Sequence, residues 1–140
     1  QAGICQRELP DYDGVIMATS EEFIKEINTT YKELNKNSIE IYCPAGWRDI
    51  CLSALAALEQ MRVAGKGVEV MQIKEKFANF RFYLSGADSK EASELIAPIL
   101  DGADTACMVC GETGERTTGG REAVYCKRHP KNPTLGQPKE

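Results

Sequence analysis

Residues 68–84, which read VEVMQIKEKFANFRFYL, decide the fold class that the sequence predicts. Apolar side chains are concentrated over 68–73, and phenylalanine and leucine alternate with arginine and tyrosine over 80–84. Alternation with a period of two is typical of a strand that buries one face. With residues 74–79 as the connection, this stretch predicts a β-hairpin or a pair of neighbouring strands.

Amphipathic helices are predicted on both sides of this stretch. Ser20 can cap a helix over 21–36, because its hydroxyl accepts a backbone N–H of the first turn and apolar residues then recur every three or four positions. A second helix is predicted over 47–64, and Gly65 ends it. Between these two helices, the alternation over 39–43 predicts a short strand.

A third helix is predicted over 89–101. Asp88, followed three residues later by Glu91, has the spacing of a capping box. Pro98 lies inside the pattern and would kink or shorten the helix, because proline has no backbone N–H. This order of helices and strands predicts an α+β fold in which the helices pack on a small antiparallel sheet.

The composition is that of one globular domain. The chain has 140 residues, of which 42% are apolar and 27% charged, and no apolar run approaches the ~20 residues that span a bilayer. We therefore predict no membrane span and, because no signal peptide is visible, a cytoplasmic location. We predict an α+β core over 1–104 with an irregular lead-in over 1–19, a metal module packed on the core over 105–129, and a flexible tail over 130–140.

Cysteine and histidine residues near the carboxyl end have the spacing of a zinc site. Two residues separate Cys107 from Cys110, which is followed by Gly111, and two residues separate Cys126 from His129. Each pair has the spacing of a zinc knuckle, and together they supply four ligands and no open position. Glycine suits the tight turn after the second cysteine. We predict a structural Zn²⁺ in a zinc-ribbon or treble-clef-like module, with unpaired thiols or disulfides as the alternative.

The remaining cysteines and aromatic rings have structural interpretations. Cys43 and Cys51 fall on apolar faces of predicted elements, so both are predicted to be small core residues. Phe77 and Phe80 are likewise predicted to belong to the core. His129 is the only histidine, so once it binds metal, general-base catalysis and a Ser–His or Cys–His pair have no base. We therefore do not expect an enzyme.

The predicted hairpin also gathers polar residues on one surface. If the strands pair, Gln72, Lys74, Arg81 and Tyr83 point away from the face that carries the phenylalanines. With Lys76, these are the candidate binding residues. They could bind a phosphate, a carboxylate or an acidic protein segment, with Arg81 as a bidentate fork. The alternative is a solvated sheet face with a few cross-strand pairs.

Several of these segments occur together in a known family. The residues that carry the likeness are Pro44, Gly46, Trp47, the run 72–77, the run 81–83, Cys107, Cys110, Gly111, Cys126 and His129. On these residues the chain resembles a family of small uncharacterised proteins from bacteria and their phages or prophages. The chain departs from that family at two places. At 78–79 the family usually has glycine in the turn, whereas this chain has Ala78 and Asn79. At 121–122 the family has an aromatic residue, whereas this chain has Arg121 and Glu122. The resemblance implies a phage-type accessory role and no particular reaction.

The function predicted first is therefore that of a non-enzymatic, zinc-stabilised binding protein encoded by a phage. It would inhibit or sequester a component of the host bacterial cell, as an anti-defence protein does, through the hairpin and the metal module. A host protein is the expected partner. Sequestration of a small nucleotide signal by the same cations is the first alternative.

Two other functions remain as alternatives. Nucleic-acid binding would use the basic residues around the zinc, namely Arg116, Arg121, Lys127, Arg128 and Lys131. The net charge of −4 opposes it, because broad attraction to nucleic acid needs several phosphates to be neutralised together. A weak hydrolase would combine a second metal with carboxylates such as Asp11, Asp13, Asp101 and Asp104. Surface or capping roles explain those carboxylates more simply.

Overall fold

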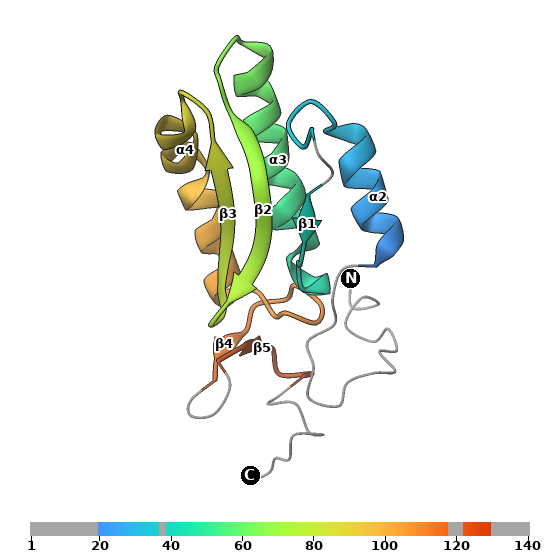
Figure 1. Ribbon diagram of the computed structural model, residues 1–140. Coiled ribbons are helices and arrows are strands. Elements are labelled where there is room, and N and C mark those ends of the chain that lie inside the picture. Colours follow the sequence, from blue (N-terminus) through green and yellow to red (C-terminus); the bar gives the residue numbers. More distant parts are fainter. Residues whose placement is uncertain (1–19, 37–38, 118–121, 130–140) are drawn as a thin grey trace.

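The computed structural model describes residues 20–36, 39–117 and 122–129, and it has the predicted α+β class (Figure 1). The predicted lead-in over 1–19 and tail over 130–140 lie outside the described residues. In chain order the elements are α2 (Glu21–Thr30), β1 (Glu40–Ile41), the 3-10 turn η1 (Ala45–Trp47), α3 (Arg48–Val63), β2 (Glu69–Lys76), β3 (Asn79–Ser85), α4 (Ser89–Asp101), the 3-10 turn η2 (Gly102–Thr105), β4 (Glu115–Arg116) and β5 (Val124–Tyr125).

The main sheet is mixed rather than wholly antiparallel. Its strand order is β1-β2-β3, with β2 and β3 antiparallel as predicted and β1 parallel to β2. The parallel pair arises because α3 lies between β1 and β2 in the chain, and a crossover helix returns the chain to the same end of the sheet. A second, two-stranded sheet pairs β4 with β5.

The β2–β3 hairpin is tighter than predicted. Its strands run as far as Lys76 and resume at Asn79, so Phe77 and Ala78 alone form the turn. Both have positive φ, of 53° and 65°, as both central residues of a type I′ turn do. The N–H of Ala78 donates to a carboxylate oxygen of Glu75 at 2.9 Å. Left-handed backbone at two successive residues lets the strands pair right up to the turn.

Helix α2 begins as predicted and ends earlier. The hydroxyl of Ser20 accepts the N–H of Phe23 at 3.1 Å, which confirms the N-cap. The helix stops at Thr30 instead of residue 36, after a pair of threonines with weak helix propensity. The chain then turns toward the sheet, where the carbonyl of Leu34 accepts the N–H of Val70 at 3.0 Å.

Helix α4 occupies its predicted range, but its start is not a capping box. The carboxylate of Asp88 makes no cap bond and instead accepts the N–H of Gly67 at 2.6 Å. Glu91 lies 3.2 Å from the ammonium of Lys66. The two carboxylates contact these groups because the segment just before β2 runs beside the start of α4. The helix continues past Pro98 to Asp101, so the proline does not shorten it.

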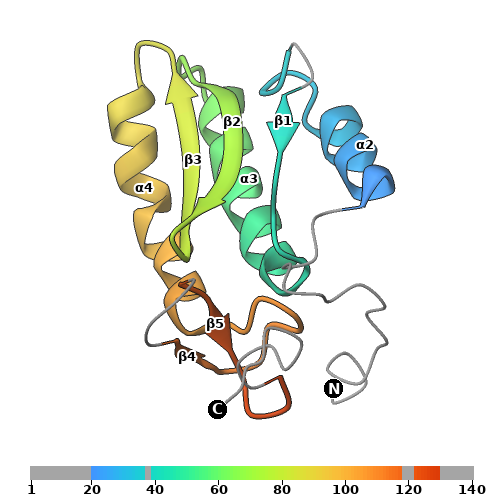
Figure 2. The ribbon, with the colours of Figure 1, turned by 60° about the horizontal axis from the view of Figure 1, so that its bottom comes forward.

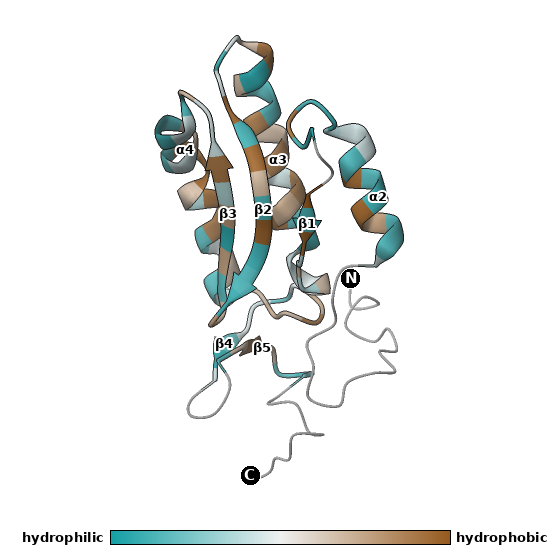
Figure 3. Ribbon diagram, viewed as in Figure 1, coloured by the Kyte–Doolittle hydropathy of each residue, from teal (hydrophilic) through white to brown (hydrophobic). Residues whose placement is uncertain are grey.

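Helices α3 and α4 cover one face of the main sheet (Figures 1 and 2). Apolar segments of β1, β2 and α3 mark the core between these layers (Figure 3). The larger side chains that are fully buried include Trp47, Leu55, Leu58 and Ile73. No described helix or strand lies on the opposite face of β2 and β3 in Figure 1. That uncovered face is where the predicted binding residues stand.

Candidate metal centre and cationic sheet face

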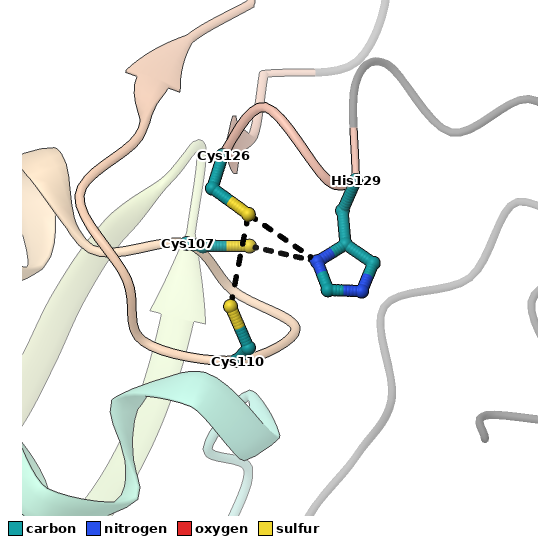
Figure 4. Close-up of side chains that lie close together, drawn as sticks. All are labelled: Cys107, Cys110, Cys126 and His129. Carbon is teal, nitrogen blue, oxygen red and sulfur yellow. Dashed lines mark hydrogen bonds between the residues drawn. The ribbon is translucent and has the colours of Figure 1, made fainter. Parts of the chain in front are cut away.

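The four predicted ligands lie together near the carboxyl end. The ligand atoms of Cys107, Cys110, Cys126 and His129 all lie within 4.8 Å of one another (Figure 4). The Nδ1 atom of His129 is 3.4 Å from the sulfur of Cys126 and 3.7 Å from that of Cys107. The sulfurs of Cys110 and Cys126 are 3.7 Å apart. Four donors gathered around one point could hold a metal ion.

The turn that carries the first two cysteines points its backbone at their sulfurs. The N–H of Val109 lies 3.4 Å from the sulfur of Cys107, and the N–H of Glu112 lies 3.5 Å from that of Cys110. Gly111 has a φ of +88°, a backbone conformation that residues with a Cβ rarely adopt. N–H groups directed at a thiolate stabilise its negative charge. The local conformation of this turn therefore positions two of the four ligands, Cys107 and Cys110.

The second pair of ligands is placed by the small sheet. Cys126 directly follows β5, and the N–H of His129 donates to the carbonyl of Cys126 at 3.0 Å. The N–H of Met108 donates to the carbonyl of Val124 at 2.9 Å. This bond ties the two halves of the site together through backbone alone.

The metal centre rests directly on the amino-terminal end of α3. The indole N–H of Trp47 donates to the carbonyl of Ala106 at 2.8 Å, and the N–H of Gly46 donates to that of Met108 at 2.8 Å. A Cβ on Gly46 would stand 2.6 Å from the backbone nitrogen of Gly111. The resemblance noted from the sequence had grouped Gly46 and Trp47 with the ligands, and the structure brings them into contact with the ligand turn.

The ligand thiols are largely out of water. Burial raises the pKa of the Cys107 thiol, while hydrogen bonds from neighbouring backbone N–H groups act against that rise. A metal ion binds thiolate rather than thiol, so binding displaces protons from these sulfurs. Burial of a thiolate is acceptable only when a cation neutralises it.

Cys43 and Cys51 are both core residues, as predicted. Their exposed fractions are 1% and 0%. A hydrogen bond with Cys43 is the main cause that raises the pKa of the Cys51 thiol, and burial adds to it. The Cys51 thiol therefore stays protonated and unreactive at neutral pH.

The predicted binding residues share the uncovered face of the β2–β3 hairpin. Pairing places Lys74 opposite Arg81 and Gln72 opposite Tyr83. We call Gln72, Lys74, Arg81 and Tyr83, together with Lys76 beside the turn, the cationic face. The amide of Gln72 donates to a carboxylate oxygen of Glu40 at 2.6 Å, and the ammonium of Lys74 lies 5.9 Å from the ring centre of Tyr83.

The cations of this face lack carboxylate partners within the described part of the chain. The ion pairs there involve Arg48, Arg62, Lys66 and Arg116. The ammonium of Lys76 lies 5.7 Å from the ring centre of Phe77, a cation–π contact that leaves its net positive charge in place. Three cations on one small sheet face create a positive potential that attracts anions.

Two apolar side chains stand near the cationic face, and the sequence did not indicate them. Phe77, predicted to be in the core, is 60% exposed because the left-handed turn directs it outward, whereas Phe80 is buried and lies 5.0 Å from Trp47 between ring centres. Met71 is 49% exposed at an irregularity in the register between Val70 and Gln72. At such an irregularity one residue is extra in its strand, so its side chain does not follow the alternation between the two faces of the sheet.

Of the residues of the other two alternatives, the structure describes Arg116, Lys127, Arg128, Asp101 and Asp104. Arg116 is engaged by Asp104 at 3.3 Å and by Glu122 at 3.4 Å, and it also donates to the carbonyl of Phe77 at 3.1 Å. Lys127 and Arg128 are exposed beside the metal centre, and Asp101 ends α4. Arg121, Lys131, Asp11 and Asp13 lie outside the described residues. Within the described ranges, the Cys/His cluster is the one group that could hold a metal.

Comparisons with protein-family models, with curated proteins and with solved structures returned no match. None of the helices in the described ranges has the length and apolar character needed to cross a bilayer. Function must therefore be inferred from the residues of this chain.

Proposed function

We propose that this chain is a non-enzymatic binding protein that holds an acidic segment of a partner protein on the cationic face. One observation carries the proposal: Lys74 and Arg81 pair across the strands of a sheet face that no described helix covers. Like charges that face each other across two strands destabilise the pair. An anionic partner would replace this repulsion with attraction.

Exposed apolar side chains near the cations favour a protein over a small ligand. Met71, Phe77 and Tyr83 are 49%, 60% and 39% exposed. Methionine, aromatic residues and arginine are enriched in protein–protein interfaces, whereas small ligands bind in concave pockets. A nucleotide signal or a nucleic acid would bind through the same cations, so the experiments below also measure the binding of both.

We propose that Zn²⁺ is the ion held by Cys107, Cys110, Cys126 and His129. Three thiolates and one imidazole are the ligands that zinc takes in closed tetrahedral sites. Such an ion supplies rigidity, because all four of its positions are filled by protein. Use of the only histidine as a ligand also supports a role without catalysis.

The partner that we propose is a component of the host bacterial cell. This part of the proposal rests on the likeness, seen in the sequence, to small proteins of bacteria and their phages. Binding would inhibit or sequester the host component, in the manner of an anti-defence protein, inside the cytoplasm.

The proposal is tested by affinity capture from bacterial lysate with three forms of the protein. They are the parent, the double variant Lys74→Glu with Arg81→Glu, and a matched control, Lys25→Glu with Lys90→Glu, which changes the net charge equally at exposed sites on α2 and α4. We expect the parent and the control to retain the same protein and the cationic-face variant to lose it. The purified partner should then bind with an affinity that falls as salt rises.

Other outcomes distinguish the alternatives. Equal retention by all three forms would contradict the role of the cationic face. Calorimetry with a panel of nucleotides, and a gel-shift at low salt with DNA and RNA, should give no binding. Tight binding of a nucleotide would replace the protein partner with a small signal. Native mass spectrometry should find one zinc ion per chain.

A further inference from the structure

We infer that the partner segment adds to the sheet as a fourth strand along the outer edge of β3, with acidic side chains at alternate positions. This inference rests on the proposed function and specifies how the cationic face is used. An extended segment that joins a sheet edge gains affinity from backbone hydrogen bonds and specificity from alternate side chains.

The first support is the direction of the backbone groups in β3. Ile73 of β2 accepts the N–H of Tyr42 at 2.8 Å, and the N–H of Val70 donates to Leu34 at 3.0 Å, so both residues direct backbone groups away from β3. Their cross-strand neighbours, Phe82 and Leu84, are therefore in non-hydrogen-bonded pairs with β2. Antiparallel alternation then turns the N–H and C=O of Phe82 and Leu84 toward the outer edge.

The same alternation applies nearer the turn. In a hairpin with a two-residue turn, the pair that flanks the turn is hydrogen-bonded, so Lys76 and Asn79 bond each other. Phe80, the next residue, directs its backbone outward. The edge therefore offers the backbone groups of Phe80, Phe82 and Leu84, and within the described part of the chain no hydrogen bond occupies them.

The second support is an apolar side chain on the helix that packs against β3. On α4, Leu95 is 47% exposed although its neighbours Ala92 and Ile96 are buried. An added strand beside β3 would give this side chain an apolar surface to pack against.

Charge selects the occupant of the edge. Arg81 lies within β3, and Lys74 lies beside it on the next strand. A second copy of this chain paired along the same edge would bring two such sets of cations together, and like charges in register destabilise pairing. An incoming strand with Glu or Asp at every second position would place its carboxylates beside Arg81, because alternate side chains share one face of a sheet.

The inference is tested by hydrogen exchange, followed by NMR, on the full zinc-loaded chain. The probe is the capped peptide Ac-Thr-Glu-Val-Glu-Val-Glu-Thr-NH2. We expect the amides of Phe80, Phe82 and Leu84 to exchange rapidly in the protein alone, while those of Arg81 and Tyr83 exchange slowly because they bond β2. Saturating peptide should slow exchange at Phe80, Phe82 and Leu84 by at least tenfold and leave Arg81 and Tyr83 unchanged.

Matched peptides separate the backbone contribution from the charge contribution. Two further peptides carry N-methyl groups on alternate backbone amides, one at the odd and one at the even residues. Only one of these two sets of N–H groups faces β3, so methylation of that set should abolish binding and methylation of the other set should leave it unchanged. Replacement of Glu by Gln should weaken binding at least tenfold, and replacement by Lys should abolish it. The variant Arg81→Glu should reverse the preference between the Glu and Lys peptides, with Lys90→Glu as the control that leaves it unchanged.

Two results would overturn the inference. One is binding of the Glu peptide without slower exchange at Phe80, Phe82 and Leu84. The other is no binding at millimolar peptide. In either case the capture experiment reports separately on the proposed function, since loss of the partner from the Lys74 and Arg81 double variant requires the cationic face but no added strand.

Discussion

Gly46 lies where the α+β core and the metal centre touch backbone to backbone. A Cβ at this position would overlap the carbonyl oxygen of Cys107 and lie 2.6 Å from the nitrogen of Gly111 and 2.8 Å from that of Cys110. No side-chain rotation relieves contacts with backbone. We expect Gly46→Ala to lower the free energy of unfolding by about 3 kcal/mol and to weaken zinc affinity, as measured by urea denaturation and chelator competition.

Gly102 provides the matched control. Its backbone is helical, and a Cβ there would meet only the side chain of Ile50, at 3.7 Å, an ordinary contact. Gly102→Ala should leave stability and zinc affinity unchanged or slightly raised, because alanine restricts the unfolded chain more than glycine does. Equal losses in the two variants would show that the close approach at Gly46 has no special cost.

At the scale of single residues, the ligands were predictable and their support was not. Two-residue spacing of soft donors is a local pattern, so Cys107 and His129 could be named from the sequence. The contact between Gly46 and the ligand turn joins positions about sixty residues apart, and no local pattern encodes it. Phe77 was misjudged for a related reason: hydrophobicity indicates burial, but the backbone conformation of a turn decides where the ring points.

Asp88 is a test case at the scale of elements, because it joins the start of α4 to the segment before β2. Its carboxylate accepts the N–H of Gly67 at 2.6 Å, and its own N–H donates to the carbonyl of Gly67 at 2.8 Å. Asp88→Ala removes only the first of these bonds. We expect a loss of about 1 kcal/mol in the free energy of unfolding, since the site is partly exposed and charge-assisted bonds contribute about 1.5–3 kcal/mol elsewhere.

Glu91→Ala is the comparison for that prediction. Glu91 pairs with Lys66 at 3.2 Å, and both side chains are well exposed. Exposed ion pairs contribute about 0–1 kcal/mol, so urea denaturation should show a smaller loss than for Asp88→Ala. A larger loss at Glu91 would favour the capping box that the sequence had suggested.

The elements themselves followed from periodicity, whereas their pairing did not. Helices α3 and α4 and the two hairpin strands have long, regular patterns, and they occur close to their predicted limits. Strand β1 has only Glu40 and Ile41, too few residues for a pattern to indicate direction. Its parallel pairing depends on α3 packing across the sheet, which is a tertiary choice. The end of α2 at Thr30 also depends on a tertiary contact, because the carbonyl of Leu34 in the following segment accepts the N–H of Val70 in the sheet.

At the scale of the whole molecule, the metal centre belongs to the same core as the helices. Met108 and Val124 are fully buried in the hydrophobic cluster that also contains Trp47 and Leu55. A structural zinc contributes about 10–16 kcal/mol of apparent binding free energy, comparable to the net stability of a domain. We expect removal of zinc by a strong chelator to unfold the chain around Trp47 as well as the metal module.

Emission of the single tryptophan gives the measurement, since Trp47 is fully buried and its indole donates to Ala106. On chelation its emission should shift to the red together with the loss of far-ultraviolet circular dichroism, and added Zn²⁺ should restore both. The variant Cys110→Ser should behave like the chelated parent. A metal-free protein with the emission and melting temperature of the loaded one would contradict the prediction.

The bond from Trp47 to Ala106 also has a consequence for synthesis of the protein. A ribosome releases the amino-terminal half first, so the indole N–H emerges well before its acceptor is made. Until the last ligand, His129, leaves the exit tunnel, the nascent chain carries an unfinished apolar surface at the start of α3. We therefore expect the fold around Trp47 to be completed only after the segment that carries Ala106 and the four candidate ligands has been made.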